Sequence, residues 1–292
     1  MITMKISQLY NKGKTVFAIE VFPPKKGSAM PEKIYAALEE IAGLNPDYIS
    51  VTCGAGGSDS QGGSPTVQVA SFLKNVCKVE PVAHLTCVAS DKQEVSDLLA
   101  QLKIHRVENI LALRGDINPD IRRKHDFIYA ADLVRFIREQ GHWEVAGACY
   151  PEGHSEADCL ETDLKHLKIK TDAGCSTLIT QVFFDNALLY SFLDKARETG
   201  IDVPVSAGII AVTSKKQIER MVSMCGASLP PQLTKMIAKY ETRPDALRDA
   251  GIDYATRQIA DLIEQGVQGI HFYAMNSPYV ARKIHDNIKD LL

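Results

Sequence analysis

The chain has 292 residues, of which 45% are hydrophobic and 24% charged, and its formal net charge is −3. These values are typical of a globular protein, and the balance of charges argues against a nucleic-acid-binding surface. No apolar run reaches the roughly 18 residues that span a bilayer, and the polar first residues lack the core of a signal peptide. Seven scattered cysteines without a C-x-x-C pair predict free thiols in a reducing cytoplasm, with neither a disulfide framework nor a zinc site.

Strand-like and helix-like segments alternate along the chain. The predicted strands are short apolar runs at 16–22, 48–53, 82–88, 109–114, 145–150, 177–184, 203–210 and 269–273. Helical patterns lie near 31–43, 65–77, 91–103, 127–140, 156–173, 186–199, 214–225 and 278–291. Eight strands, each followed by a helix, predict a (β/α)₈ TIM barrel that forms a single catalytic domain over residues 1–292.

The connection between the last two predicted strands, residues 211–268, is longer than the others. It contains Leu229-Pro230-Pro231 and two further helical stretches, 231–239 and 244–265, which predict a helical insertion before the last strand. A doubly wound sheet is the alternative architecture. No G-x-G-x-x-G follows the first strand, where a dinucleotide-binding fold would need it.

The first predicted strand carries one ionisable side chain, Glu20, on the same face as apolar residues. Pro23 and Pro24 end the strand just beyond it, because proline cannot donate to a ladder of hydrogen bonds. A buried carboxyl needs a partner or keeps its proton, and both conditions suit proton transfer. A simple ion pair with Lys25 or Lys26 is the alternative.

In a barrel of this type, chemistry gathers at the carboxyl ends of the strands. The predicted ends would bring acids, a histidine, an arginine, hydroxyls and amides to one cavity, which indicates a binding and catalytic mouth. These residues are Glu20, Thr52, His84, Thr86, Arg114, Gly115, Asp116, Tyr150, Gln181, Asp185, Gly208, Tyr273 and Asn276. His84 has no second histidine at a ligand spacing, so no metal site is predicted.

One strand runs directly into Arg114-Gly115-Asp116. Gly115 permits a tight turn or the close approach of a ligand. The guanidinium of Arg114 suits a phosphate or carboxylate, and Asp116 can accept from the N–H groups of a heterocycle. A surface ion pair between Arg114 and Asp116 is the alternative.

A helix that follows the fifth strand carries Asp163, His166 and Lys170 at i, i+3 and i+7, on one helix face. Two interpretations are open. The face can be solvated and charged, as on most helices, or it can lie over a phosphorylated cofactor, for which Lys170 would supply a cation.

Seven short motifs, in this order and over essentially the whole chain, resemble the bacterial methylenetetrahydrofolate reductases. The motifs are Phe17-Ala18-Ile19-Glu20-Val21-Phe22-Pro23-Pro24, Ser50-Val51-Thr52, Ala83-His84-Leu85-Thr86-Cys87, Leu113-Arg114-Gly115-Asp116, Ala148-Cys149-Tyr150-Pro151-Glu152, Ile179-Thr180-Gln181-Val182-Phe183-Phe184-Asp185 and His271-Phe272-Tyr273. The resemblance implies an FAD-dependent barrel that holds its flavin without a Rossmann motif. It also implies a ping-pong reaction, in which hydride passes from NADH or NADPH to the flavin and then to 5,10-methylenetetrahydrofolate, giving 5-methyltetrahydrofolate.

The resemblance further implies roles for individual residues. Glu20 would be the general acid that opens the five-membered ring of the folate, and Asp116 would lie beside the flavin and tune its potential. Substrate would contact Glu20, Gln181, Gln217, Met221 and Tyr273. The flavin would contact Thr52, His84, Arg114, Gly115, Asp116, Tyr150, His154, Asp163, His166 and Lys170.

Four positions depart from the family pattern. His166 stands where many relatives have Asn and Ile169 where they have Arg, so the adenine-dinucleotide end would be held with one cation fewer. Met221 replaces a Phe that packs on folate and nicotinamide, and a thioether has no stacking face. Ser277 replaces an Arg near the glutamate tail of the folate, which removes a bidentate carboxylate partner.

Two other classes of protein remain open. A barrel aldolase or methyltransferase could use Glu20 and Asp116 as an acid–base pair, but an aldolase needs a strand-end lysine, and none of the eight predicted ends carries one. Alternatively, the chain could be a flavoprotein subunit that takes electrons from a redox partner, or passes methyl groups within a complex. We expect a homo-oligomer.

Overall fold

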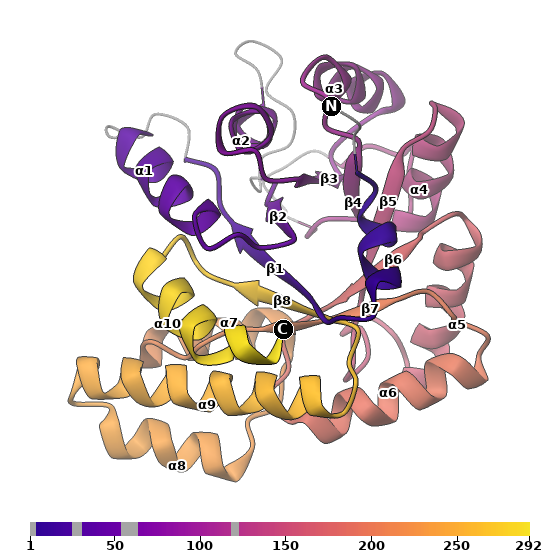
Figure 1. Ribbon diagram of the computed structural model, residues 1–292. Helices are drawn as coiled ribbons and strands as arrows, with labels where there is room; N and C mark the ends of the chain where they lie inside the picture. Colours follow the sequence, from indigo (N-terminus) through magenta and orange to yellow (C-terminus); the bar gives the residue numbers. More distant parts are fainter. Residues whose placement is uncertain (1–3, 25–30, 54–63, 118–122) are drawn as a thin grey trace.

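The computed structural model describes residues 4–24, 31–53, 64–117 and 123–292. Eight parallel strands close into a barrel in the order of the sequence (Figure 1), which confirms the predicted (β/α)₈ fold. The strands are β1 (Val16–Val21), β2 (Tyr48–Val51), β3 (Pro81–Thr86), β4 (Asn109–Leu113), β5 (Glu144–Cys149), β6 (Thr177–Thr180), β7 (Val205–Ile209) and β8 (Gly269–Tyr273).

Helices surround the barrel. They are α1 (Pro31–Ala42), α2 (Pro65–Phe72), α3 (Lys92–Ile104), α4 (Ala130–Glu139), α5 (Leu160–Asp172), α6 (Asn186–Glu198), α7 (Lys215–Cys225), α8 (Pro231–Tyr240), α9 (Pro244–Glu264) and α10 (Pro278–Ile288), with the short helices η1 (Ile6–Lys12), η2 (Leu73–Cys77) and η3 (Lys289–Leu291). Three of them, α7, α8 and α9, lie between β7 and β8, so the predicted helical insertion is confirmed. Its last helix, α9, packs against α8 within the insertion and against α10, which follows β8. Among the described residues, no helix is long and apolar enough to cross a bilayer.

The sixth strand is shorter than predicted, because it ends at Thr180 and not at 184. The backbone carbonyls of Phe183 and Phe184 accept hydrogen bonds from side chains of α9, at 3.1 Å from Gln258 Nε2 and 2.6 Å from the Tyr254 hydroxyl. The apolar run after Thr180 is therefore a buried loop whose polar groups pair with the insertion instead of a neighbouring strand.

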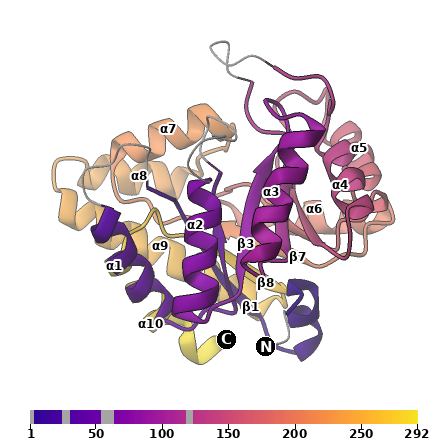
Figure 2. The ribbon, with the colours of Figure 1, turned by 90° about the horizontal axis from the view of Figure 1, so that it is seen from above.

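The amino-terminal end of the barrel is filled by η1, which the sequence analysis did not predict. Ile6, Leu9 and Tyr10 lie on one side of η1 and are buried against inward-facing side chains of the strands. The hydroxyl of Tyr10 lies 2.7 Å from Ser206 Oγ on β7. Figure 2 shows η1 and the carboxyl terminus at one end of the barrel, with α7 at the other. We call the end that η1 covers the closed end.

Asn109 connects η1 to the strands at the closed end. Its Oδ1 accepts a hydrogen bond of 3.0 Å from the Ile6 backbone N–H, and its Nδ2 donates to the Met4 carbonyl at 3.1 Å and to Glu80 Oε1 at 3.0 Å. The carboxylate of Glu80 also accepts from Lys74 Nζ at 2.5 Å. The polar groups of Asn109 are thus all paired while the residue itself is fully buried.

The alternation of β1 determines the direction of Glu20. Phe17 and Ile19 point outward into the main core between the strands and the helices, whereas Val16 and Ala18 point into the barrel. Glu20 continues the inward series by one step of two residues. Its carboxyl is therefore inside the barrel, near the carboxyl end of the strand.

Candidate active site at the carboxyl ends of the strands

Glu20 is buried, with 7% of its surface exposed, and two imidazole nitrogens lie within 3.5 Å of its carboxylate. Its Oε2 lies 3.5 Å from Nε2 of His84 on β3 and 3.4 Å from Nε2 of His271 on β8. Burial lowers the pKa of His84 to about 4, against an opposing effect of the Glu20 charge. His84 is therefore neutral near pH 7. The alternative partners, Lys25 and Lys26, lie outside the described residues.

His271 is a site residue that sequence reasoning did not single out. It is fully buried, and its Nε2 lies 3.1 Å from Oγ of Ser50, another fully buried residue. A signal was present, because His271 stands two residues before Tyr273 and therefore shares its inward face. The missing information was the register, which places β8 and β2 on either side of β1, with Glu20 opposite both Ser50 and Tyr273.

Tyr273 lies at the mouth with its hydroxyl directed at the backbone of β6. The hydroxyl donates a 2.8 Å hydrogen bond to the Thr180 carbonyl. Gly208 on β7 makes room for this contact, since a Cβ there would lie 2.3 Å from the Thr180 oxygen and 2.8 Å from the Tyr273 hydroxyl. Burial, with a contribution from Glu20, raises the pKa of Tyr273 well above its ordinary value, so the phenol keeps its proton.

Arg114 is held by Glu156 and not by Asp116, so the predicted alternative pairing is wrong. Both terminal nitrogens of the Arg114 guanidinium donate to the Glu156 carboxylate at 2.6 Å. This hydrogen bonding raises the pKa of Arg114 and lowers that of Glu156. Glu156 can reach the Arg114 guanidinium because it lies in a loop. The helix α5 begins at Leu160, four residues after the predicted start. Asp116 is exposed beside them.

Gly115 has a φ of +86°, in the left-handed region where glycine is favoured. A Cβ at this position would lie 3.0 Å from Cβ of Thr86 on β3. The chain therefore turns away from β4 directly over the end of β3, which keeps Arg114 and Asp116 at the mouth.

The loop after β5 is built around Tyr150 and His154. Their rings meet edge to face with centroids 4.7 Å apart. The backbone N–H of His154 donates to Oδ2 of Asp163 at 3.1 Å, which links the loop to the first turn of α5. Burial raises the pKa of Tyr150 to about 12, and the Asp163 charge adds to this effect. Tyr150 is thus a neutral phenol whose ring packs against His154.

The charged face of α5 is divided between two environments. Asp163 is buried, and Nζ of Lys170 donates to the Ala148 carbonyl near the end of β5 at 2.5 Å. His166, by contrast, is exposed. The alternative of a solvated face therefore describes His166, whereas Asp163 and Lys170 are directed toward the end of β5.

The glutamines predicted to contact substrate both use their amide oxygens within the protein. Oε1 of Gln181 accepts from the Val182 backbone N–H at 2.8 Å. Oε1 of Gln217 accepts from the backbone N–H and the hydroxyl of Thr213, at 2.7 and 3.0 Å. In the part of the chain that the structure describes, neither amide nitrogen has a protein acceptor. Each side chain therefore presents N–H donors. Met221 on α7 is half-buried and packs on an apolar cluster that the insertion forms with the loop after β6.

Asn276 connects the loop after β8 to the residue that follows β1 through two hydrogen bonds. Its Oδ1 accepts from the Phe22 backbone N–H at 2.7 Å, and its Nδ2 donates to the Phe22 carbonyl at 2.8 Å. Met275 and Asn276 have φ values of +51° and +55°, which are uncommon for residues other than glycine. Ser277 caps α10 by accepting from the Val280 backbone N–H at 3.4 Å.

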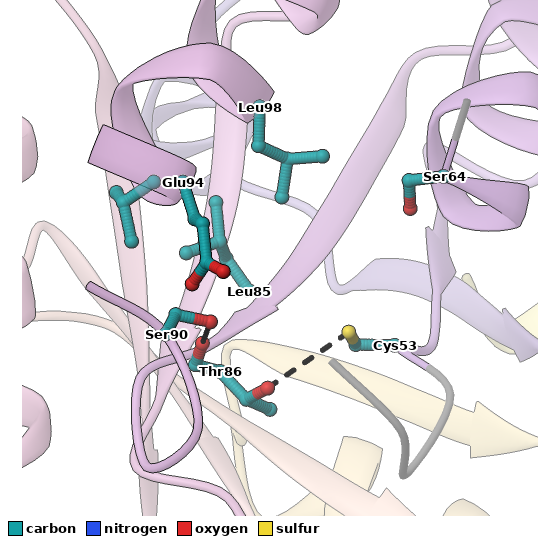
Figure 3. A pocket seen from close by; sticks show the side chains of 8 residues that line it. Cys53, Ser64, Leu85, Thr86, Ser90, Glu94 and Leu98 are labelled. Carbon is teal, nitrogen blue, oxygen red and sulfur yellow. Dashed lines mark hydrogen bonds between the residues drawn. The ribbon is translucent and has the colours of Figure 1, made fainter. Parts of the chain in front are cut away.

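A small cavity lies beside the mouth, between β3, α3 and the start of α2 (Figure 3). Its volume is about 10 Å³, which is room for about one water molecule. Two contacts join residues that line this cavity. The Thr86 hydroxyl makes a weak contact with Cys53 Sγ at 3.9 Å, and the Ser90 hydroxyl donates a hydrogen bond to the Thr86 carbonyl at 3.2 Å. It cannot admit a flavin or a pterin. Thr52 lies next to this wall, with its carbonyl accepting from the Thr66 hydroxyl at 2.9 Å.

Taken together, the mouth combines a buried acid, two buried imidazoles, an exposed acid and two cationic side chains. Such a set can transfer a proton at Glu20 and bind an anionic group at Arg114 and Lys170. Within the described ranges, no group of three or more His, Cys, Asp or Glu side chains is arranged to hold a metal ion. The barrel and its mouth define a (β/α)₈-barrel enzyme.

The family model for methylenetetrahydrofolate reductase matches residues 5–289. The chain belongs to this family of oxidoreductases, as the sequence motifs predicted. It is 31% identical over 287 residues to methylenetetrahydrofolate reductase (NADH) 1 of Arabidopsis thaliana, covering 93% of this chain and 48% of the plant protein. It is 32% identical over 265 residues to the 5,10-methylenetetrahydrofolate reductase of Pectobacterium carotovorum subsp. carotovorum, covering 91% and 87%. The chain thus spans about half the length of the plant relative and most of the bacterial one.

A solved structure has the same fold with a TM-score of 0.70 and 14% identity, covering 99% of this chain and all of the other. It is an uncharacterized protein from Clostridium thermocellum that binds two copies of 5-methyl-5,6,7,8-tetrahydrofolic acid. At this identity the likeness concerns the fold alone.

Proposed function

We propose that this protein reduces 5,10-methylenetetrahydrofolate to 5-methyltetrahydrofolate, with FAD as redox cofactor, NADH or NADPH as electron donor, and a ping-pong order of substrates. The observation that carries the proposal is the buried carboxyl of Glu20 among polar groups at the mouth of the barrel, in a chain that the reductase family model matches over residues 5–289.

The side chains at the mouth fit a flavin dinucleotide. Arg114 and Lys170 provide cations for a pyrophosphate, and the N–H groups of Gln181 provide donors for a ring carbonyl. His84 Nε2 is buried without a hydrogen-bond partner among the described residues, and Oε2 of Glu20 lies 3.5 Å from it. A bound flavin supplies the capacity to take a hydride equivalent from one substrate and pass it to another.

Glu20 would hold and deliver the proton that opens the folate ring. Proton transfer of this kind needs an acid within hydrogen-bond reach of the acceptor, and a buried carboxyl at the strand end meets that need. Asp116 would lie along the pyrimidine edge of the flavin, where its negative charge disfavours added electron density. Gln217, Met221 and Tyr273 would line the folate, with Met221 packing through its thioether.

The remaining flavin contacts would come from Thr52 and Gly115 and from the β5–α5 segment. Tyr150 and His154 offer a fixed pair of rings, and Asp163 is already used to hold the loop. His166 is exposed where a cation or amide would help, so we expect a loosely held adenine end.

The wider assignment follows from this function. We propose that residues 1–292 form one catalytic domain, that it works as a homo-oligomer, and that it is cytoplasmic. All seven cysteines carry free thiols, which supports a reducing compartment. Sedimentation of the purified protein would measure the oligomeric state.

The decisive experiment is a visible spectrum of the purified protein, followed by anaerobic titration with NADH and then methylenetetrahydrofolate. Flavin bands near about 370 and 450 nm, as for oxidised flavins in general, should bleach with the first and return with the second. Bands that respond only to the folate would indicate another electron donor, such as a redox partner protein. A colourless protein that does not take up FAD would contradict the proposal. In Asp116→Asn the flavin potential should rise, and an unchanged potential would remove Asp116 from the neighbourhood of the flavin.

A further inference from the structure

Glu20 is contacted by other strands on one oxygen only. Oε2 lies 3.4 Å from His271 Nε2 and 3.5 Å from His84 Nε2, and His271 Nε2 is in turn 3.1 Å from Ser50 Oγ. Among the described residues, Oε1 has no hydrogen-bond partner. The two oxygens of this carboxyl are therefore in different environments, although the side chain has only 7% of its surface exposed.

The position of the proton on His271 follows from the burial of its ring. Nδ1 is buried and without a partner in the described part of the chain, whereas Nε2 has two oxygen atoms within reach. A buried N–H without an acceptor is costly, and an unpaired ring lone pair costs less. The ring proton therefore belongs on Nε2, from which it points at Glu20 Oε2 and Ser50 Oγ.

We propose that His271, oriented by Ser50, is a positioning residue for Glu20: it holds Oε2 inside the barrel, so that the acidic proton resides on Oε1 and faces the substrate. This inference rests on the proposed role of Glu20 as general acid. Its benefit is geometric, because small displacements of a reacting group are expensive in rate. The competing view is that His271 only packs, since its ring also lies near Tyr48 and Tyr273, with centroids 6.0 and 5.4 Å away.

The first test is direct and needs no turnover. Nitrogen-15 NMR of the imidazole rings, with His271→Gln to assign the signals, should find the proton of His271 on Nε2. A ring protonated on Nδ1 alone would overturn the proposal, because that tautomer cannot donate to Glu20.

The second test separates positioning from packing by kinetics. His271→Leu removes the donor, and we expect the reduction of folate by the reduced enzyme to slow by about 10- to 100-fold. His271→Gln restores an N–H near the place of Nε2 and should recover most of that loss. Reduction of the flavin by NADH should be unchanged in both variants.

The pH profile supplies a readout that packing would not move. Without the N–H donor the ionised form of Glu20 loses support, so the pH at which the rate falls on the alkaline side should rise in His271→Leu. Among the described residues, the other titratable groups that face Glu20 are His84 on β3 and Tyr273 on β8, and both are retained in every variant. If His271→Leu changes neither the alkaline side of the pH–rate profile nor the rate itself, the positioning role is wrong.

A smaller change guards against misfolding. Ser50→Ala deletes one oxygen and should slow folate reduction by about three- to tenfold, the usual effect of one hydrogen bond. Ser206→Ala is the matched control, because Ser206 is equally buried but bonds to Tyr10 at the closed end. Equal rates in these two serine variants would contradict the proposal.

Kinetics of Glu20→Gln, measured in parallel, distinguish a failure of the general-acid role of Glu20 from a failure of the positioning role of His271. If Glu20→Gln retains folate reduction within a few-fold, the general-acid role and the positioning role both fall. If Glu20→Gln is inactive while His271→Leu and Ser50→Ala behave as wild type, only the positioning role falls.

Discussion

Buried polar groups occur at both ends of the barrel interior, but the groups named below are paired differently. Thr177 Oγ1, at the start of β6, is an exception at the closed end, because it has no partner among the described residues. At the closed end, Asn109 uses all its side-chain groups in hydrogen bonds, and Tyr10 is paired with Ser206. Around Glu20, one ring nitrogen of His84 and one of His271 have no partner among the described residues. Polar groups that are satisfied within the protein stabilise it, whereas groups left unpaired are available to a ligand or to chemistry. The comparison therefore assigns a structural role to the closed end and, under the proposed function, the reaction to the mouth.

The largest expected effect is that of Glu20→Gln, which should affect the reaction at the mouth and leave the stability of the protein unchanged. The amide keeps the size of the side chain but cannot supply the acidic proton, so folate reduction should fall by about 10²–10⁴-fold. Flavin content and the melting temperature should stay close to wild type. Steady-state kinetics with a parallel thermal melt would measure this, and an activity within a few-fold of wild type would remove Glu20 from the reaction.

The closed end should give the opposite result in Asn109→Ala. The substitution leaves the Ile6 N–H and Glu80 Oε1 without their buried partner, and we expect a loss of about 2–4 kcal/mol in the free energy of unfolding. The rate per folded molecule should not change. Urea unfolding would measure the loss, with the exposed Asn287→Ala as control, which should stay within about 0.5 kcal/mol. A fall in rate without a loss of stability would break the comparison.

The neutral state of His84 predicts a dependence of stability on pH. Burial lowers the pKa of His84 from 6.5 to about 4, so between these values the unfolded chain binds a proton that the folded chain does not. The contribution of neutral His84 to the free energy of unfolding should therefore be fully present above about pH 6.5. It should be lost as the pH is lowered toward 4, by on the order of 1–3 kcal/mol.

In His84→Gln that part of the pH dependence should vanish. The variant must be compared with wild type at each pH, because Glu20 and His271 face the same position. Denaturant unfolding of the flavin-free protein from pH 7 to 4 is the measurement, and parallel curves for the two proteins would show that His84 is not the group that titrates.

The smallest predicted effect concerns Glu156, whose carboxylate accepts hydrogen bonds from both terminal nitrogens of the Arg114 guanidinium. If Arg114 receives a phosphate, then Glu156 competes with it and adds an unfavourable negative charge. Glu156→Gln should therefore tighten FAD binding to the flavin-free protein by about three- to tenfold.

Fluorescence titration would measure this affinity. Glu152→Gln is the control, because that carboxylate accepts from the Ser228 backbone N–H at 3.1 Å instead of pairing with a cation. Weaker FAD binding in Glu156→Gln would mean that Glu156 orients the fork and does not compete for it.

Most of the fold could be predicted from the sequence, because the strands are short apolar runs and the helices between them have caps and a regular apolar period. The end of β6 could not, since Phe183 and Phe184 are apolar enough for a strand and only the contact with α9 makes them a loop. The helix η1 was missed for the opposite reason: Ile6, Leu9 and Tyr10 are three apolar positions in a polar segment, and their burial depends on the barrel they fill.

For the candidate site, Glu20 could be predicted because one carboxylate in an apolar strand conflicts with its surroundings. The contacts of His271, Ser50 and Glu156 could not. They depend on which strands are neighbours and on where α5 begins. The residues concerned are far apart in sequence, and Glu20 and His271 are separated by 251 positions. Sequence spacing within one element carries no such information.

The plug formed by η1 fills the amino-terminal end of the barrel interior with the side chains of Ile6, Leu9 and Tyr10. A ligand of Glu20 would therefore approach from the side where the strands end. Under the proposed function, the nicotinamide and the folate would both have to come to this side. The alternating order of substrates proposed above would then follow from the architecture as well as from the chemistry.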